Sequence, residues 1–341
     1  MKTNKKSTIY TDKHQFNKAI QCQSWDGVAN GYRKWYKQIE EKGARKISDR
    51  LLELAEIRPG HRVLDIATGY GEPAINAAEN VSSSGSVLAI DISSRILELA
   101  RERAKARGLQ NIEFREGGIE NTTLPQEYFD AVLCRWGLMH FRDLDKVLRK
   151  IFRSLVPKGV FAAATWGKPS EVPILSIPLN KALEIANESL FSTKHKNGVR
   201  LINNNNNLSC IGPFSLADPV TLKHYFEEAG FCDVTIKELI ITIEINSVQD
   251  YIRSIRELNT TIRSIVSNLP IQRQGQIWDD VANEIVRRGY VKMTNFNQGD
   301  KTVHHNESSK LGPVRFSNKV ICIAGHKYST GRSGLHNRRL P

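Results

Sequence analysis

Two acidic residues and a glycine-rich turn are the residues of this chain with the clearest capacity for chemistry. Asp65 and Asp91 each lie at the end of an apolar run, and Gly69 and Gly71 lie in the turn after the first run. Glycine lets a backbone turn tightly and approach a ligand, because it has no Cβ. A carboxylate at the mouth of the second run can accept hydrogen bonds from ribose hydroxyls. The spacing therefore predicts a nucleoside pocket.

Asp65 discriminates between kinds of nucleoside ligand. Residues 69–74 also satisfy the loose GxGxxA pattern of dinucleotide-binding folds. A pyrophosphate favours bare N–H groups at a helix N-terminus, so an acid in the same turn disfavours it. A ligand with an ammonium group and a cationic sulfur is instead attracted by that acid. The alternative is that Asp65 caps the turn and Asp91 caps the next helix.

The segment after residue 134 holds candidate residues for catalysis. Imidazole titrates near neutral pH, so His140 is the first candidate for a general base, with a surface turn residue as the alternative. Arg135 lies between it and the preceding apolar run. Aromatic side chains near the N-terminus could pack over an acceptor or fasten the N-terminal helix to the core: Trp25, Tyr32, Trp35 and Tyr36.

Alternating strands and helices must position these residues. Residues 47–55 and 144–155 show helical periodicity, while the runs between such helices are nearly all apolar. Such strands pair in parallel and are buried on both faces, which predicts an α/β, doubly wound, Rossmann-like sheet. Asp218, Pro219 and Gly230 mark the start and end of another helix. Strands are expected at 234–245 and 319–324, with a structured excursion between them.

Four segments carry a resemblance to the class I S-adenosylmethionine-dependent methyltransferases, and within them to the ubiquinone and menaquinone C-methyltransferases. They are LDIATGYGEP at 64–73, FDAVLCRWGLMHF at 129–141, LVPKGV at 155–160 and GPFSLADP at 212–219. The resemblance covers roughly residues 25–327. It implies a seven-stranded sheet with helical lid insertions and S-adenosyl-L-methionine as cofactor. These motifs are specific for the fold and the cofactor and say little about the substrate.

The resemblance also implies roles for individual residues. Gly69 and Gly71 are expected at the methionine end of the cofactor, with Asp65 nearby, Asp91 and Ile92 at the ribose and adenine, and Arg135 at the cofactor carboxylate or the active-site mouth. Gly118 stands where the family usually has an aspartate, so Ile119 or Glu120 is expected to replace the adenine contact. The full set of expected cofactor residues is Asp65, Ala67, Gly69, Gly71, Asp91, Ile92, Gly118, Ile119, Glu120 and Arg135.

The expected organisation consists of a core with insertions and two tails. The segments are a basic tail at 1–24, N-terminal helices and the cofactor-binding core at 25–168, a lid insertion with an Asn-rich loop at 169–213, a core helix and sixth strand at 214–246, a helical lid insertion at 247–315, the last core strand at 316–327 and a basic tail at 328–341. The lid insertions are where acceptor choice is expected. The alternative is that they only thicken the fold.

Charge, cysteines and hydropathy narrow the function. More than half of the net charge of +13 comes from the two ends, and basic tails are more often solvated than nucleic-acid-binding. The five cysteines lack CxxC spacing and His304 and His305 lack partner ligands, so no disulfide framework or metal site is expected. No apolar run is long enough to span a bilayer and no leader is evident. We expect a cytoplasmic protein, with contact at a membrane surface left open.

The predicted function is transfer of a methyl group to carbon or oxygen of a small organic acceptor, and the resemblance makes a quinone-like or prenylated acceptor the first choice. Three alternatives are kept: an RNA or protein methyltransferase, supported by the charge; a non-catalytic cofactor-binding regulator, suggested by Gly118; and, more remotely, a nicotinamide dehydrogenase. The predicted catalytic residues are His140 and Arg135. The acceptor, the need for a base and the oligomeric state are not determined by the sequence.

Overall fold

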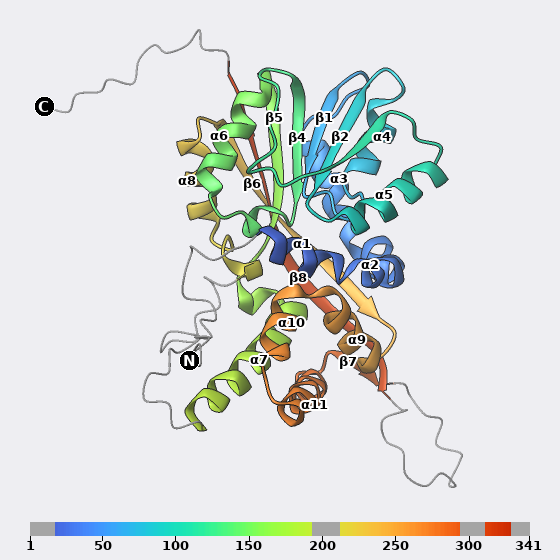
Figure 1. Ribbon diagram of the computed structural model, residues 1–341, viewed down its shortest axis with the longest axis vertical. Coiled ribbons are helices and arrows are strands. Elements are labelled where there is room, and N and C mark those ends of the chain that lie inside the picture. The colour runs from blue at the N-terminus through green and yellow to red at the C-terminus, as the bar shows by residue number, and fades with distance from the viewer. Residues whose placement is uncertain (1–17, 193–211, 294–310, 329–341) are drawn as a thin grey trace, which may run out of the picture. The chain divides into compact units, whose positions relative to one another are not determined.

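A computed structural model of the chain describes residues 18–192, 212–293 and 311–328 (Figure 1). The chain divides into two compact units. Unit 1 lies within residues 1–46, 166–217 and 240–320, and unit 2 lies within 47–165, 218–239 and 321–341.

Unit 2 contains the parallel sheet that the apolar runs predict. Its strands are β1 (Arg62–Ile66), β2 (Ser86–Asp91), β3 (Ile112–Glu116), β4 (Phe129–Arg135) and the greater part of β5 (Leu155–Trp166). β1 pairs in parallel with both β2 and β4, β2 with β3, and β4 with β5. With β6 (Cys232–Ile245) and β8 (Leu311–His326), the strand order is β3-β2-β1-β4-β5-β8-β6. The reversal between β1 and β4 marks a doubly wound fold and confirms that prediction.

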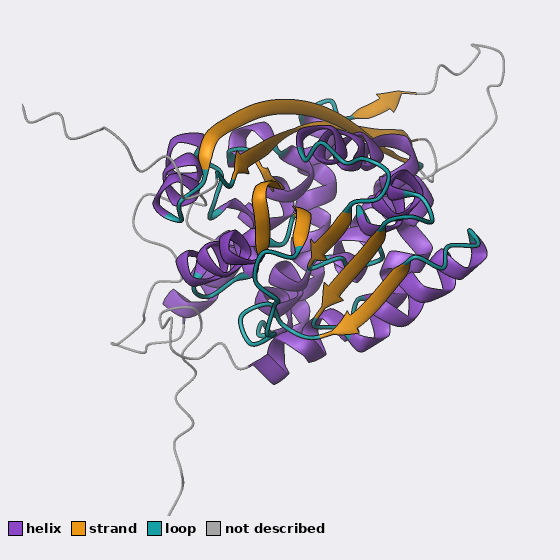
Figure 2. Cartoon of the chain, turned by 90° about the horizontal axis from the view of Figure 1, so that it is seen from above, coloured by secondary structure: helices purple, strands orange, loops and turns teal. Residues whose placement is uncertain are grey.

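Helices flank the strands of this sheet (Figure 2). They are α3 (Arg45–Leu54), α4 (Ala74–Val81), α5 (Ser94–Ala106), η2 (Leu138–His140), α6 (Leu144–Ser154) and α8 (Pro219–Glu228). The side chains of Ser93, Asp143 and Asp218 accept N–H bonds at the starts of α5, α6 and α8. The predicted start of α8 at Asp218 is thereby confirmed. α4 begins one residue after Pro73, which takes the cap position rather than the first helical one.

Aromatic side chains and one buried lysine close the core of unit 2. The rings of Phe161 and Phe226 stack with 5.0 Å between their centroids. Lys327 is only 6% exposed, and its Nζ donates to the Leu155 carbonyl at 2.8 Å and pairs with Glu127 at 3.2 Å. The lysine is therefore part of the buried body of unit 2.

Unit 1 is mainly helical. Its elements are α1 (Lys18–Asp26), α2 (Ala29–Tyr36), the π-helix η1 (Lys37–Ala44), η3 (Pro169–Glu171), α7 (Pro173–Ser192), η5 (Gly212–Phe214), α9 (Val248–Leu258), α10 (Thr260–Ser267), α11 (Ile271–Arg287) and β7 (Val291–Met293). The buried hydroxyl of Tyr251 donates to the Ile174 carbonyl at 2.7 Å, and its ring lies 4.8 Å from that of Phe316. These contacts tie α9 to α7 and β8.

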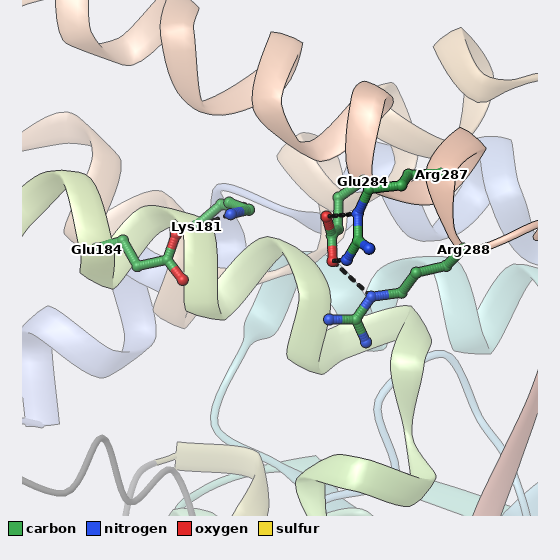
Figure 3. A network of polar contacts seen from close by, with 5 residues as sticks. All are labelled: Lys181, Glu184, Glu284, Arg287 and Arg288. Carbon is green, nitrogen blue, oxygen red and sulfur yellow. Dashed lines mark hydrogen bonds and ion pairs between the residues drawn. The ribbon is translucent and has the colours of Figure 1, made fainter.

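An ion cluster lies on α7 and α11 of unit 1 (Figure 3). Glu284 accepts from Arg287 at 2.7 Å and from Arg288 at 2.5 Å. The hydrogen bond from Arg287 is the main cause that lowers the pKa of Glu284 to about 2. Lys181 pairs with Glu184 at 2.9 Å on the neighbouring helix. The two arginines are about half exposed or more, so the cluster contributes little to stability.

The excursions beyond the sheet differ in detail from the sequence expectation. β8 begins at Leu311 rather than 319, and the short strand β7, which was not predicted, pairs with it in antiparallel orientation. The expected lid insertions contain α7 and α9 to α11, and their role in acceptor choice stays a prediction. The Asn-rich run at 203–207 and most of both expected tails lie outside the described residues.

Among the N-terminal aromatic residues, Trp35 takes part in packing of the N-terminal helices. It is 3% exposed, and its Nε1 donates to Glu257 at 2.6 Å, while Lys34 pairs with the same carboxylate at 2.9 Å. These contacts fasten α2 to α9, so Trp35 serves the packing of unit 1. The neighbouring Gly31 lies so close to α9 that an added Cβ would come within 2.6 Å of the Glu257 carbonyl oxygen.

This close approach makes a stability prediction. We expect Gly31→Ala to lower the free energy of unfolding by about 1–3 kcal/mol, because the methyl group has no room. Gly275→Ala in α11 is the matched control, since no described atom lies within 4 Å of that Cβ position, and it should raise the same quantity by about 0.5–1 kcal/mol. Chemical denaturation measures both. Equal effects at the two sites would contradict the packing of α2 on α9.

Candidate cofactor site

The turn after β1 contains three residues in the left-handed region of backbone conformation. Ala67, Gly69 and Gly71 all have positive φ, at 56°, 54° and 94°. No described atom lies within 4 Å of a Cβ built on Gly69, whereas a Cβ on Gly71 would meet Ile75 at 2.7 Å. Gly69 therefore leaves open space beside the turn, as the prediction of a ligand requires. Gly71 instead lets the turn pack on α4. A contact of either glycine with the ligand stays a prediction.

Asp91 fastens the turn to the end of β2. Its Oδ2 accepts the Gly69 N–H at 2.8 Å and its Oδ1 accepts the Ser93 N–H at 2.9 Å. Ser93, not Asp91, caps α5, so the capping alternative for Asp91 is wrong. A carboxylate oxygen has two lone pairs, which leaves Asp91 acceptor capacity for ribose hydroxyls. Its contact with the ribose stays a prediction.

Asp65 is the most unusual residue of the site. It is fully buried, and neither carboxylate oxygen has a hydrogen-bond partner among the described residues. The Thr68 hydroxyl and the Ala74 amide lie near enough to favour the charged form, but neither makes a hydrogen bond of good geometry. Burial raises the pKa of Asp65 to about 7, although Arg135 partly offsets it. A buried acceptor without a donor is suited to a cationic ligand.

Arg135 lies at the end of β4, where its charge acts on Asp65. Its guanidinium donates to the Ser48 hydroxyl of α3 at 3.1 Å and lies 5.1 Å from the centre of the Trp136 ring. Trp136 itself has a φ of 59°, which is uncommon for a bulky residue. The charge of Arg135 thus acts on Asp65, where it lowers the pKa of that carboxyl. Contact of Arg135 with a cofactor carboxylate stays a prediction.

The segment after β3 is expected at the adenine. Ile119 is 2% exposed, and the Glu120 carboxylate accepts the N–H groups of Arg142 at 3.0 Å and Asp143 at 3.2 Å. Lys150 of α6 donates to the carbonyls of Ile119 and Glu120 at 2.8 Å each. Glu120 therefore connects this segment to the loop after β4. An adenine contact by Gly118, Ile119 or Glu120 stays a prediction.

His140 closes the short helix η2 in the loop after β4. It is half-buried, and burial lowers the pKa of its imidazole to about 4. The ring is therefore neutral at neutral pH and can accept a proton, but it is a weaker base than a solvated histidine. Its role as a base stays a prediction.

Three polar residues that support the site were not singled out in the sequence. Ser48 holds Arg135, Lys150 holds the segment after β3, and Arg103 of α5 contacts Glu72 in the glycine turn. None lies within a recognised motif. The acid at Glu72 and the basic end of α5 were visible, but only folding brings them together.

The remaining candidates add no second site. Four described cysteines form no disulfide, namely Cys22, Cys134, Cys232 and Cys322, and residues 210 and 304–305 lie outside the described segments. In the described part of the chain, no three His, Cys, Asp or Glu side chains gather as a metal site would require. Nor does any helix there combine the length and hydropathy needed to cross a membrane.

Comparison with known proteins assigns the chain to a family. Residues 57–230 match the methyltransferase domain family. The ubiquinone/menaquinone biosynthesis C-methyltransferase UbiE of Serratia proteamaculans is 34% identical over 134 residues, which cover 39% of this chain and 51% of that protein. UbiE of Pseudomonas entomophila is 31% identical over 188 residues, which cover 54% of this chain and 70% of that protein. The chain thus spans about half the length of several curated relatives that it matches.

A solved structure agrees with the fold. Phosphoethanolamine N-methyltransferase 2 of Haemonchus contortus, in complex with phosphomonomethylethanolamine and S-adenosylhomocysteine, superimposes with a TM-score of 0.51 at 14% identity. The match covers 94% of this chain and 61% of that one. At this identity the likeness concerns the fold alone.

The residues at the β1 turn fit S-adenosyl-L-methionine. The buried, unpartnered Asp65 carboxylate offers acceptors for an ammonium group, and the open space at Gly69 admits a ligand close to the backbone. Asp91 stands at the neighbouring strand end. Asp65, Gly69 and Asp91 would therefore hold the cofactor.

The affinity for S-adenosylmethionine should depend on pH through Asp65. Because the pKa of Asp65 is about 7, its charge is lost as pH falls below 7, and S-adenosylmethionine should bind more weakly at pH 6 than at pH 7.5. Asp65→Asn should weaken binding at pH 7.5 by about 10- to 100-fold. It should also remove the acid-side loss of affinity. Isothermal titration calorimetry across pH measures both effects, and an unchanged pH profile in Asp65→Asn would contradict the assignment.

The same carboxylate predicts a change in stability. The pKa is about 3.8 when unfolded and about 7 when folded, so stability is lost as pH rises through this window and stays low above it. Without cofactor, Asp65→Asn should raise the free energy of unfolding at pH 8 by up to about 4 kcal/mol, and by little at pH 4. Denaturation at the two pH values tests this. A variant that is less stable at pH 8 would argue against a strained Asp65 charge.

The open space at Gly69 makes a separate prediction. Gly69→Val should raise the dissociation constant of S-adenosylmethionine by about tenfold or more, because it fills the space and strains a positive φ. Gly108→Val is the matched control, since Gly108 has a φ of 71° and equally open surroundings but follows α5, outside the turn. Asp91→Ala should weaken binding as well. Wild-type affinity in both site variants would contradict the proposed site.

Proposed function

Because the chain belongs to the methyltransferase domain family, with S-adenosyl-L-methionine as cofactor and a likeness to UbiE, we propose that it methylates carbon or oxygen of a small organic acceptor. A quinone-like or prenylated acceptor is our first choice, and it is supported by the likeness to the ubiquinone/menaquinone biosynthesis C-methyltransferases. The observation that carries the cofactor side is the buried Asp65 carboxylate without a hydrogen-bond partner.

The chain's own residues would act mainly by holding and orienting. When bound, the cofactor supplies a methyl group on a positively charged sulfur, so the leaving group needs no further activation. Asp65 would attract the positive end of the ligand, and Asp91 would accept from the ribose. Alignment of the acceptor atom with the methyl carbon and sulfur then lowers the barrier by proximity.

A base is needed only where the acceptor must lose a proton. We propose that His140 takes that proton on an imidazole nitrogen. The new bond joins the acceptor carbon or oxygen to the methyl carbon, the carbon–sulfur bond breaks, and its electron pair stays on sulfur. The burial that lowers the pKa of His140 to about 4 keeps the ring unprotonated and ready to accept.

The proposal is tested in two steps. Calorimetry with S-adenosylmethionine and S-adenosylhomocysteine measures cofactor binding, and transfer of labelled methyl to prenylated hydroquinones and phenols measures catalysis. Binding without transfer to these acceptors or to metabolite extracts would favour the non-catalytic regulator. Transfer to RNA at about 150 mM salt would instead favour the nucleic-acid alternative, because phosphate contacts weaken with salt.

His140→Ala provides the catalytic prediction. We expect turnover to fall by about 10- to 100-fold, while the dissociation constant of S-adenosylmethionine changes less than about twofold. Since the pKa is about 4, turnover should show no His140 titration between pH 5.5 and 8. His224→Ala, on the exposed face of α8, is the control and should leave turnover unchanged. Wild-type turnover in His140→Ala would remove the assignment of the base.

A further inference from the structure

Arg103 of α5 makes several contacts with the glycine turn. Its Nη2 pairs with Oε1 of Glu72 at 2.6 Å, its Nη1 donates to the Tyr70 carbonyl, and its guanidinium lies 4.5 Å from the centre of the Tyr70 ring. The side chains of Arg103 and Glu72 are only 13% and 4% exposed. One arginine therefore holds two consecutive parts of the turn, on either side of Gly71.

The packing of α5 explains why this contact is possible. A Cβ on Gly71 would lie 3.4 Å from that of Ala100, one helical turn before Arg103 on the same face of α5. The small Ala100 lets the turn approach the helix, and Arg103 then reaches over it to Tyr70 and Glu72. The side of the turn at Gly69 stays open.

We propose that Arg103 is a positioning residue for the cofactor. Arg103 fixes the backbone from Tyr70 to Glu72, and the methionine end of the cofactor lies against the turn in this conformation. The proposal rests on the cofactor site assigned above. Arg103 does not itself reach the ligand in this assignment. It acts through the turn, whose position is also set by the Asp91 bond to the Gly69 N–H.

The arginine is suited to this task in a way that lysine is not. Its planar guanidinium donates in two directions at once and stacks on an aromatic ring, whereas an ammonium is a compact point charge. A carboxylate buried next to the turn also needs a partner, and Glu72 finds one in Arg103. The ion pair therefore joins the buried carboxylate of the turn to α5.

The same helix offers a matched control. Arg107 of α5 pairs with Glu79 of α4 at 2.9 Å, but the two side chains are 35% and 40% exposed. This pair also joins α5 to the helix that follows the turn. Arg107→Met therefore removes an ion pair between α4 and α5 that is more exposed than the Arg103–Glu72 pair.

The test compares two ligands that share the adenosine and the amino-acid group and differ in the methyl group and the charge on sulfur. If Arg103 acts by position, Arg103→Met should raise the dissociation constants of S-adenosylmethionine and S-adenosylhomocysteine by a similar factor of about ten or more. If Arg103 acts only through its charge, its removal should favour the cationic ligand and improve S-adenosylmethionine relative to S-adenosylhomocysteine. That selective improvement would overturn the proposal.

Folding is controlled separately. Arg103→Met leaves the Glu72 carboxylate without its arginine, so the double variant Arg103→Met with Glu72→Gln removes both charges and keeps a folded protein measurable. Arg103→Met and the double variant should both bind the two ligands weakly. The loss of affinity in the double variant should be smaller than the sum of the losses in Arg103→Met and Glu72→Gln alone. Arg103→Lys should keep only part of the wild-type affinity. Arg107→Met should keep wild-type affinity. A double variant that melts normally and binds both ligands as tightly as wild type would refute the positioning role.

The outcome is distinguishable from a failure of the proposed function. If the wild-type protein binds neither ligand, the cofactor site itself is wrong. If wild type binds, and Gly69→Val and Asp91→Ala weaken binding while the Arg103 variants do not, only the role of Arg103 fails.

Discussion

A buried carboxylate that lacks a hydrogen-bond partner determines the electrostatics of the cofactor site. Asp65 sits on a strand that is buried on both faces, where charge is costly and the pKa rises toward neutrality. Such a residue is unfavourable for the empty protein. In the proposed site, a positively charged ligand would supply the missing donors and offset this cost.

The site depends on a turn that is held from two sides and open on a third. Asp91 binds its backbone from β2, and Arg103 binds it from α5. Gly71 lets the turn lie close to α4 and α5, whereas Gly69 faces open space. A turn fixed in this way can present N–H groups and a buried acid in one geometry without reorganisation on binding. Of the two side chains that hold the turn, Asp91 is also proposed to contact the ligand, whereas Arg103 is not.

A second set of contacts joins the end of β4 and the loop after it to α3 and to the segment after β3. Arg135 bonds Ser48 of α3 while its charge acts on Asp65. Glu120 accepts two N–H groups of the loop that follows His140. The Glu120 carboxylate thus links the proposed adenine segment to the part of the loop that lies just after His140. This connection gives a physical reason for the acid at Glu120 that does not require an adenine contact.

The sequence by itself determined the doubly wound fold, the site edge and the class of cofactor, because these depend on local signals. Apolar strands, helical periodicity and a glycine turn after Asp65 are readable along the chain, and parallel strands end at one edge whatever the rest of the fold does. Only the tertiary structure decided which glycine faces open space, since neighbours of Gly71 come from α4 and α5. It also decided that Arg103 serves the turn and that Lys327 is buried. Those contacts join residues far apart in sequence, and no local pattern encodes their meeting.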